Sequence, residues 1–170
     1  MSKRGARKAV RLDRVELLIL DVDGVLTDGR LYFSAGGETL KVFNVHDGHG
    51  IKLLMGSGVR VAAVSGRRSA AVTARMRELT VRNVVQGCTD KVAALERLTR
   101  RLRVDPLACA CICDDTSDLP LMSAVGFTAA VADAHPLVRA AAHWVSKAPG
   151  GRGAVRELCD AILRARATRP

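Results

Sequence analysis

Two aspartates one residue apart end an apolar segment, in LLILDVDGVLTDG at residues 17–29. Carboxylates beside a buried strand are costly unless they are paired, hold a metal ion or take part in a reaction. Residues i and i+2 of a strand point to the same side, so Asp21 and Asp23 are expected to face one point. A carboxylate in such a place can serve as a nucleophile.

Further polar side chains follow three other apolar segments. They are Ser65 in VSGR, Lys91 in QGCTDK, and Asp114, Asp115 and Asp118 in CICDDTSD. Such groups gather at the carboxyl ends of the strands in open parallel sheets. Asp21 and Asp114 offer the oxygen ligands that Mg²⁺ prefers. Ser65 and Lys91 suit the oxygens of a phosphoryl group.

Each of these residues also has an ordinary structural interpretation. A pair of acids after a strand is commonly solvated in a loop, and Ser65 suits the start of a helix. Lys91 fits a solvated helix position, and Asp118 fits the first turn of a helix, where the dipole favours an acid. The functional interpretation depends on all of them occurring together, each at an expected strand end.

The elements that must position these residues alternate between short apolar segments and helical patterns. Strands are expected near residues 16–22, 59–65, 82–86, 107–113, 126–132 and 143–146, and helices near 69–79, 90–103, 117–125, 135–142 and 153–166. Continuous apolar strands separated by helices indicate a parallel sheet covered on both faces. The predicted fold is therefore α/β and Rossmann-like. One domain is expected over residues 15–166, after a basic tail at residues 1–14.

A β-hairpin is expected as a small insertion in this pattern, in GRLYFSAGGETLKVFNV at residues 29–45. Its two β-rich arms flank Ala35-Gly36-Gly37. Its apolar side chains are Leu31, Tyr32, Phe33, Val42 and Phe43. A hairpin alone is marginally stable, so we expect these side chains to pack against the domain or against other subunits.

The net charge of +10 is concentrated at the two ends of the chain. Residues 1–14 hold six basic residues and one acid, and residues 161–170 hold three arginines and no acid. Such ends are expected to be solvated. Only 3% of the residues are aromatic, too few for a base-stacking platform. We therefore expect no nucleic-acid partner.

Composition also indicates where the protein works. No apolar run approaches the roughly 20 residues of a membrane span, and the basic N-terminus leads into no signal-type segment. The five cysteines are an odd number, for which reduced thiols are the simplest account. Cys109, Cys111 and Cys113 share one face of a predicted strand and are expected to be buried rather than to bind metal. The expected location is cytoplasmic, with no membrane partner.

Four motifs together make the chain resemble the phosphatases of the haloacid dehalogenase (HAD) superfamily. DVDGVLT resembles the first motif, Ser65 the second, Lys91 the third, and Asp114 with Asp118 the fourth. Over roughly residues 15–160, FNVHDGHGI, VSGR, VADAHP and GGRGAVRE resemble one subfamily. It contains the 3-deoxy-D-manno-octulosonate 8-phosphate (KDO 8-phosphate) phosphatases, alongside relatives that act on nine-carbon sialic-acid-type phosphates.

The resemblance implies a Mg²⁺-dependent phosphatase that works through an aspartyl-phosphate. Asp21 would be the nucleophile, and Asp23 would be the general acid/base. The metal ligands would be the Asp21 and Asp114 side chains and the Asp23 backbone carbonyl, supported by Asp118 and Asp115. Ser65 and Lys91 would bind the phosphoryl oxygens, with Arg67 near the substrate.

Two further residues are candidate substrate contacts. Arg152, in GGRG, suits the capture of a substrate carboxylate through two hydrogen bonds, and the alternative is an exposed arginine before a helix. His46 is a candidate contact or a plain loop histidine, and it stands where relatives commonly have Arg. Cys113 stands where the family usually has Gly, and His49 where it often has an aromatic residue. These differences from the family pattern leave the hydrolytic residues intact, and they leave the identity of the substrate open.

The gap between Asp23 and Ser65 has room for the hairpin and one helix, so no cap domain is expected. The resemblance implies a homotetramer in which hairpins and C-terminal segments of neighbours complete the pocket. KDO 8-phosphate is the preferred substrate, and a sialic-acid-type 9-phosphate or another sugar phosphate is the alternative. A phosphate-binding or scaffolding homologue without catalysis is a further alternative, against which the intact Asp21 and Asp23 argue.

Overall fold

The structure, a computed structural model, describes residues 11–168 and contains a six-stranded sheet. Its order is β5-β4-β1-β6-β7-β8, and every neighbouring pair is parallel. The strands are β1 (Leu17–Leu20), β4 (Arg60–Ser65), β5 (Asn83–Gln86), β6 (Cys109–Cys113), β7 (Phe127–Ala130) and β8 (Trp144–Val145). The predicted α/β, Rossmann-like fold is confirmed. Most of the predicted tail at residues 1–14 lies outside the described residues.

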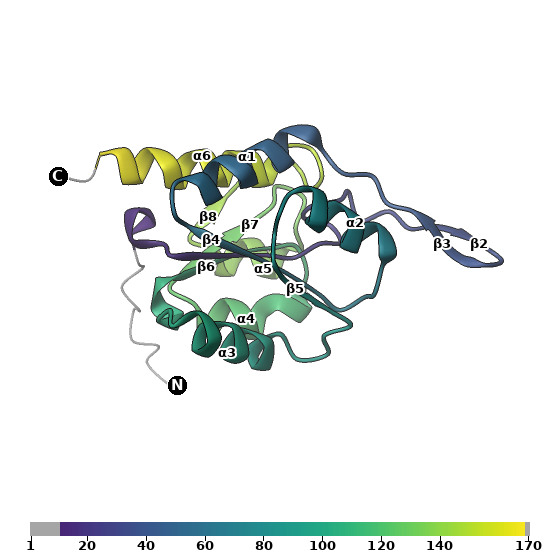
Figure 1. The fold of residues 1–170 in the computed structure, drawn as a ribbon, viewed down its shortest axis with the longest axis horizontal. Helices are drawn as coiled ribbons and strands as arrows, with labels where there is room; N and C mark the ends of the chain where they lie inside the picture. The colour runs from purple at the N-terminus through teal and green to yellow at the C-terminus, as the bar shows by residue number, and fades with distance from the viewer. Residues whose placement is uncertain (1–10, 169–170) are drawn as a thin grey trace.

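Helices cover both faces of this sheet. They are α1 (Val45–Gly56), α2 (Ala70–Glu78), α3 (Lys91–Leu102), α4 (Leu119–Ala124), α5 (Pro136–Ala141) and α6 (Ala154–Ala167), with 3-10 turns η1 (Leu12–Arg14), η2 (Pro106–Ala108) and η3 (Thr116–Asp118). Helices α1 and α6 pack together on one face, and α3 and α4 pack together on the other (Figure 1).

The core runs through the two central strands. All four residues of β1 and all five of β6 are at most 1% exposed, because helices cover both faces of the sheet. Cys109, Cys111 and Cys113 lie in this core, and all five cysteines of the chain are unpaired. This agrees with their interpretation as small core residues.

The hairpin consists of β2 (Tyr32–Ser34) and β3 (Gly37–Leu40), an antiparallel pair that projects from the body (Figure 1). Its strands are shorter than the expected range of residues 29–45. Phe33 and Val42 are 60% and 54% exposed, whereas Phe43 packs partly against the core. Within residues 11–168 there is no further insertion that would form a cap domain.

The helix expected near residues 153–166 is present as α6, which includes residues 161–167 of the segment expected to be a solvated tail; Arg164 and Ala167 within it are exposed. The helix continues because Ile162 is buried in the core and because the Arg166 side chain is hydrogen-bonded to two backbone carbonyls. Its guanidinium donates hydrogen bonds to the Val15 carbonyl at 3.1 Å and to the Ser57 carbonyl at 3.4 Å.

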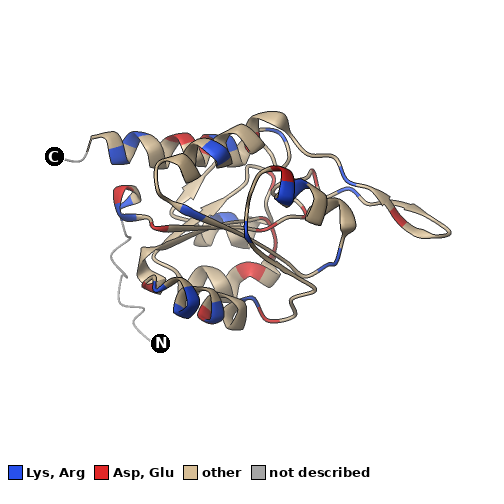
Figure 2. Cartoon of the chain, viewed as in Figure 1, with Lys and Arg blue, Asp and Glu red and all other residues tan. Residues whose placement is uncertain are grey.

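Lys and Arg positions occur along helices on both faces of the sheet (Figure 2). No helix within residues 11–168 has both the length and the apolar character that a membrane crossing needs.

Candidate active site

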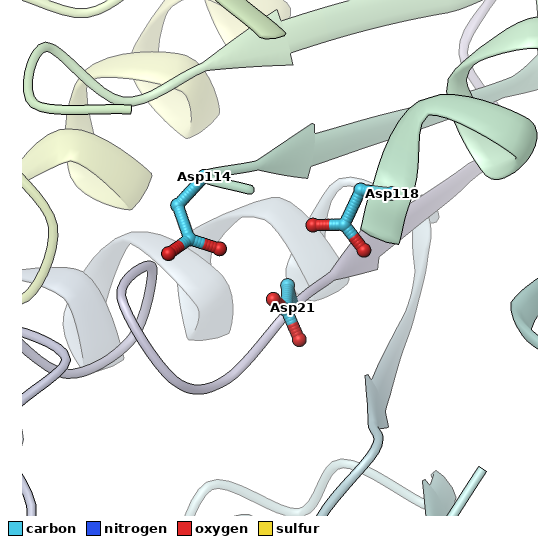
Figure 3. Close-up of side chains that lie close together, drawn as sticks. All are labelled: Asp21, Asp114 and Asp118. Atoms are coloured by element: carbon cyan, nitrogen blue, oxygen red, sulfur yellow. The ribbon is translucent and has the colours of Figure 1, made fainter. Parts of the chain in front are cut away.

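Three carboxylates meet beyond the carboxyl ends of the central strands. Asp21 follows β1 and Asp114 follows β6, and these two strands are paired with Leu20 opposite Ile112. Asp118 ends η3 and is fully buried. One oxygen of each carboxylate lies within 4.8 Å of the others (Figure 3). The predicted meeting of Asp21 with the acidic cluster of the fourth motif therefore occurs.

The turn after β1 brings Asp23 to the same site. The strand was expected to extend over residues 16–22, but it is shorter. The strand ends at Leu20 because the chain then forms a turn, in which the Val22 carbonyl accepts hydrogen bonds from the Leu26 and Thr27 amides. Gly24 has a φ of +83°, and a Cβ on it would lie 2.0 Å from Asp114 Oδ2. The turn can approach Asp114 only because this residue is glycine.

Lys91 supplies a cation to the carboxylate cluster. Its Nζ lies 2.9 Å from Asp21 Oδ1 and 2.5 Å from Asp118 Oδ1. It is the first residue of α3, whose start is capped by Asp90 through hydrogen bonds from the Val92 and Ala93 amides. Burial alone would lower the pKa of Lys91, but the charges of Asp21 and Asp118 raise it above its ordinary value.

Burial and crowding raise the pKa of two of the carboxyl groups. Burial raises the pKa of Asp21 to about 6, the Asp118 charge adds to this, and Lys91 opposes it. Burial and then the Asp21 charge raise the pKa of Asp114 to about 8. Burial is the main cause of both shifts, and the neighbouring carboxylates add to it.

The donor set fits a divalent cation such as Mg²⁺. Asp118 Oδ2 is buried and accepts no hydrogen bond from the described residues, so it is an oxygen without a partner beside two others. Carboxylate oxygens are the ligands that Mg²⁺ prefers. The side chains grouped here are Asp21, Asp114 and Asp118. The sequence predicted only a supporting role for Asp118. In the structure its carboxylate belongs to the same cluster as those of Asp21 and Asp114.

A cleft of about 310 Å³ lies over this cluster. The predicted site residues that line it are Asp21, Asp23, Ser65, Arg67, Lys91, Asp114 and Asp115. His46 and Arg152 are exposed and are not among its lining residues. Asp115 Oδ1 accepts a hydrogen bond from the Thr116 amide at 2.6 Å, so this carboxylate caps η3 rather than joining the cluster.

The residues at the end of β4 connect the cleft to the hairpin. Ser65 Oγ donates a hydrogen bond to Asp23 Oδ2 at 3.4 Å. The Arg67 guanidinium donates to Glu38 Oε2 at 3.3 Å and lies 5.6 Å from the centre of the Phe33 ring. Arg67 therefore reaches the hairpin from the edge of the cleft.

Sequence reasoning missed two residues of the hairpin, Glu38 and Lys41. Lys41 Nζ contacts Asp23 Oδ1 directly and lies 3.2 Å from Glu38 Oε2. A signal was present, because these two are the only charged residues between Leu31 and Phe43. No spacing rule connects them to Asp23, which precedes them by a turn and a strand.

Comparison with known proteins places the chain among phosphatases. A model of haloacid dehalogenase-like hydrolases matches residues 80–157. The 3-deoxy-D-manno-octulosonate 8-phosphate phosphatase KdsC of Yersinia pestis is 47% identical over 155 residues, which cover 91% of this chain and 83% of that protein.

Solved structures agree in fold and in family. The crystal structure of the Yersinia pestis phosphatase has a TM-score of 0.90 at 46% identity, covering 92% of this chain and 85% of that one. The Moraxella catarrhalis phosphatase, in complex with magnesium, phosphate and KDO, has a TM-score of 0.89 at 38% identity, covering 92% and 90%. The chain belongs to the 3-deoxy-D-manno-octulosonate 8-phosphate phosphatase family of haloacid dehalogenase-like hydrolases.

Proposed function

We propose that the protein hydrolyses KDO 8-phosphate to KDO and inorganic phosphate, with Mg²⁺, through an aspartyl-phosphate on Asp21. The observation that carries this proposal is the contact of Lys91 with Asp21 inside a cluster that also contains Asp114 and Asp118. A relative of the same fold was solved with magnesium, phosphate and KDO together, which supports both the metal and the sugar.

The residues that would hold Mg²⁺ are Asp21, Asp114 and Asp118 through their side chains and Asp23 through its backbone carbonyl. A bound Mg²⁺ would balance the charge of these carboxylates and of the phosphoryl group.

In the first step, an Asp21 carboxylate oxygen attacks phosphorus and the bond from phosphorus to the sugar oxygen breaks. Asp23 donates a proton to that oxygen, which leaves as a hydroxyl group. Ser65 Oγ and Lys91 Nζ, which both line the cleft over Asp21, donate hydrogen bonds to the phosphoryl oxygens in this step. The products of this step are KDO and the aspartyl-phosphate.

In the second step, water attacks the same phosphorus. Asp23, now deprotonated, takes a proton from the water as it attacks. The bond between phosphorus and the Asp21 oxygen breaks, which releases inorganic phosphate and restores both carboxyl groups. The acid and the base of the two steps are thus one residue.

A substrate panel tests this proposal. Purified protein is assayed for phosphate release from KDO 8-phosphate, a sialic-acid-type 9-phosphate and a neutral hexose 6-phosphate, with Mg²⁺ or with EDTA. We expect Mg²⁺-dependent release with the highest kcat/KM for KDO 8-phosphate and none from Asp21→Asn. A higher kcat/KM for another ester would overturn the substrate assignment. The same trace release by wild type and Asp21→Asn would indicate a non-catalytic homologue.

We further propose that the protein is a homotetramer of a single catalytic domain over residues 15–166 and that it acts in the cytoplasm. The apolar hairpin supports the assembly, because Leu31, Phe33 and Val42 are each at least half exposed on an element that projects from the body. The five unpaired cysteines support a reducing compartment.

A further inference from the structure

Lys41 is a buried ammonium group at the base of the hairpin. It follows β3 directly, and its side chain is 1% exposed. A buried charge is costly unless it is paired, and Lys41 is paired twice, with Asp23 and with Glu38 at 3.2 Å. The hairpin is therefore fixed to the turn that carries the proposed acid/base.

The two oxygens of Asp23 have different partners. Oδ1 accepts a hydrogen bond from Lys41 Nζ, and Oδ2 accepts one from Ser65 Oγ at 3.4 Å. An ammonium group is a donor with no acceptor, so a proton on Oδ1 would face the Lys41 donors. Lys41 therefore fixes Oδ1, and this orients Oδ2 toward Ser65, which is expected to bind the phosphoryl group.

Glu38 holds Lys41 from the opposite side. Its Oε2 lies 3.2 Å from Lys41 Nζ and accepts a hydrogen bond from Arg67, and its Oε1 accepts one from Ser69 Oγ at 2.5 Å. Ser69 stands at the N-cap position of α2. Glu38 thus joins Lys41 to the connection between β4 and α2, which leaves the Lys41 side chain little freedom.

We propose that Lys41 is a positioning residue that orients the Asp23 carboxylate for proton transfer to the leaving oxygen, and that Glu38 keeps Lys41 in place. This rests on the proposed phosphatase function. Direct binding of substrate by Lys41 is the competing role, and the 1% exposure of its side chain argues against it.

Two esters that differ in leaving group separate these roles. The alkoxide of KDO needs a proton in order to leave, whereas 4-nitrophenolate leaves without one. If Lys41 acts through Asp23, Lys41→Met should lower kcat/KM for KDO 8-phosphate by about 10²-fold, the lower end of general acid catalysis. The loss for 4-nitrophenyl phosphate should be under about tenfold. The matched control is Lys52→Met, on the exposed side of α1, which should leave both values unchanged.

A double variant shows whether Lys41 acts through Asp23. Residues that act as a unit are non-additive, so Lys41→Met should add little to the loss that Asp23→Asn causes with KDO 8-phosphate. Lys41→Arg keeps the cation and should restore most of the activity. Glu38→Gln should show the same leaving-group dependence as Lys41→Met in weaker form, and it replaces that variant if Lys41→Met does not fold.

Equal losses with the two esters, additive losses with Asp23→Asn, or a raised KM at unchanged kcat would each overturn the proposal. Failure of the proposed function gives a different result, because the wild-type protein would then release phosphate from neither ester or would prefer another sugar phosphate of the substrate panel.

Discussion

Lys91 Nζ lies 2.9 Å from Asp21 Oδ1, and this contact joins the third motif of the chain to the first. It arises because α3 begins at Lys91, directly after the loop that follows β5, while Asp21 directly follows β1. The contact places a fixed positive charge beside the proposed nucleophile. That charge partly balances the carboxylates and is available to the phosphoryl group as negative charge moves onto it.

Lys91→Met should lower kcat/KM with both KDO 8-phosphate and 4-nitrophenyl phosphate. Removing one preorganised donor of this kind costs about 10²–10³-fold in rate. The loss should be similar for the two esters, because Lys91 acts on the phosphoryl group that they share. Steady-state kinetics measures both losses. A loss below about tenfold would show that Lys91 does not take part in the reaction.

Stabilisation of the fold by Mg²⁺ should increase with pH. In the metal-free protein the pKa of Asp21 is raised to about 6 and that of Asp114 to about 8. Between about pH 4 and these folded-state pKa values, the folded state therefore binds more protons than the unfolded chain, so its stability falls as the pH rises across that range. Mg²⁺ binds the deprotonated carboxylates and reverses this loss.

The measurement is the rise in Tm on adding Mg²⁺, near pH 5 and near pH 8. We expect a small rise at the lower pH and a larger one at the higher pH, because protons compete with the metal. Asp114→Asn should abolish most of the difference. An equal rise at both pH values would contradict the assignment of these carboxyl groups to the metal.

Arg152→Ala should raise KM for KDO 8-phosphate more than for 4-nitrophenyl phosphate, which has no carboxylate. Arg152 is exposed, and its loop is fixed to the catalytic turn by a hydrogen bond of 2.9 Å from the Gly151 amide to the Val25 carbonyl. Hydrogen bonds to charged groups contribute about 1.5–3 kcal/mol, which corresponds to roughly tenfold or more in KM. Arg164→Ala, on the exposed side of α6, is the control. Equal effects on both esters would exclude carboxylate capture.

Phe33→Ser should weaken the assembly of subunits. Phe33 is 60% exposed on the projecting hairpin, and exposed apolar patches of this kind mark interfaces. Light scattering should give a tetramer for the wild type and a smaller mass for the variant. Leu137→Ser, on α5 at 59% exposure, should keep the mass of the wild type. A fully active wild-type monomer would refute this interpretation.

Much of the site could be predicted from the sequence because its residues stand at strand ends. Asp21, Ser65 and Asp114 each end or follow a buried apolar strand, and parallel strands bring their carboxyl ends to one edge. The contacts of Lys41 with Asp23 and Glu38 could not be predicted in this way. They depend on the direction in which the hairpin projects from the body, and no local periodicity records that direction. The end of β1 at Leu20 could not be predicted in this way either, since it depends on the turn in which the Val22 carbonyl accepts hydrogen bonds from the Leu26 and Thr27 amides.

Asp23→Asn should separate the two chemical steps. The variant should form the phosphoenzyme slowly from KDO 8-phosphate but readily from 4-nitrophenyl phosphate, and it should hydrolyse that phosphoenzyme slowly in both cases. Rapid mixing with 4-nitrophenyl phosphate should then give a burst of phenolate, about one per site, followed by slow turnover, with steps slowed by about 10²–10⁴-fold. Equal first-step defects with no burst would mean that Asp23 does not carry the proton.

The phosphoenzyme that accumulates in Asp23→Asn allows the most direct test of the central claim, that Asp21 attacks phosphorus. The variant is quenched in acid during the burst, digested, and analysed by mass spectrometry for the residue that carries a phosphoryl group. We predict one phosphoryl group, on Asp21, and none in the double variant with Asp21→Asn. A phosphoryl group on another residue, or turnover without any phosphoenzyme, would contradict the mechanism.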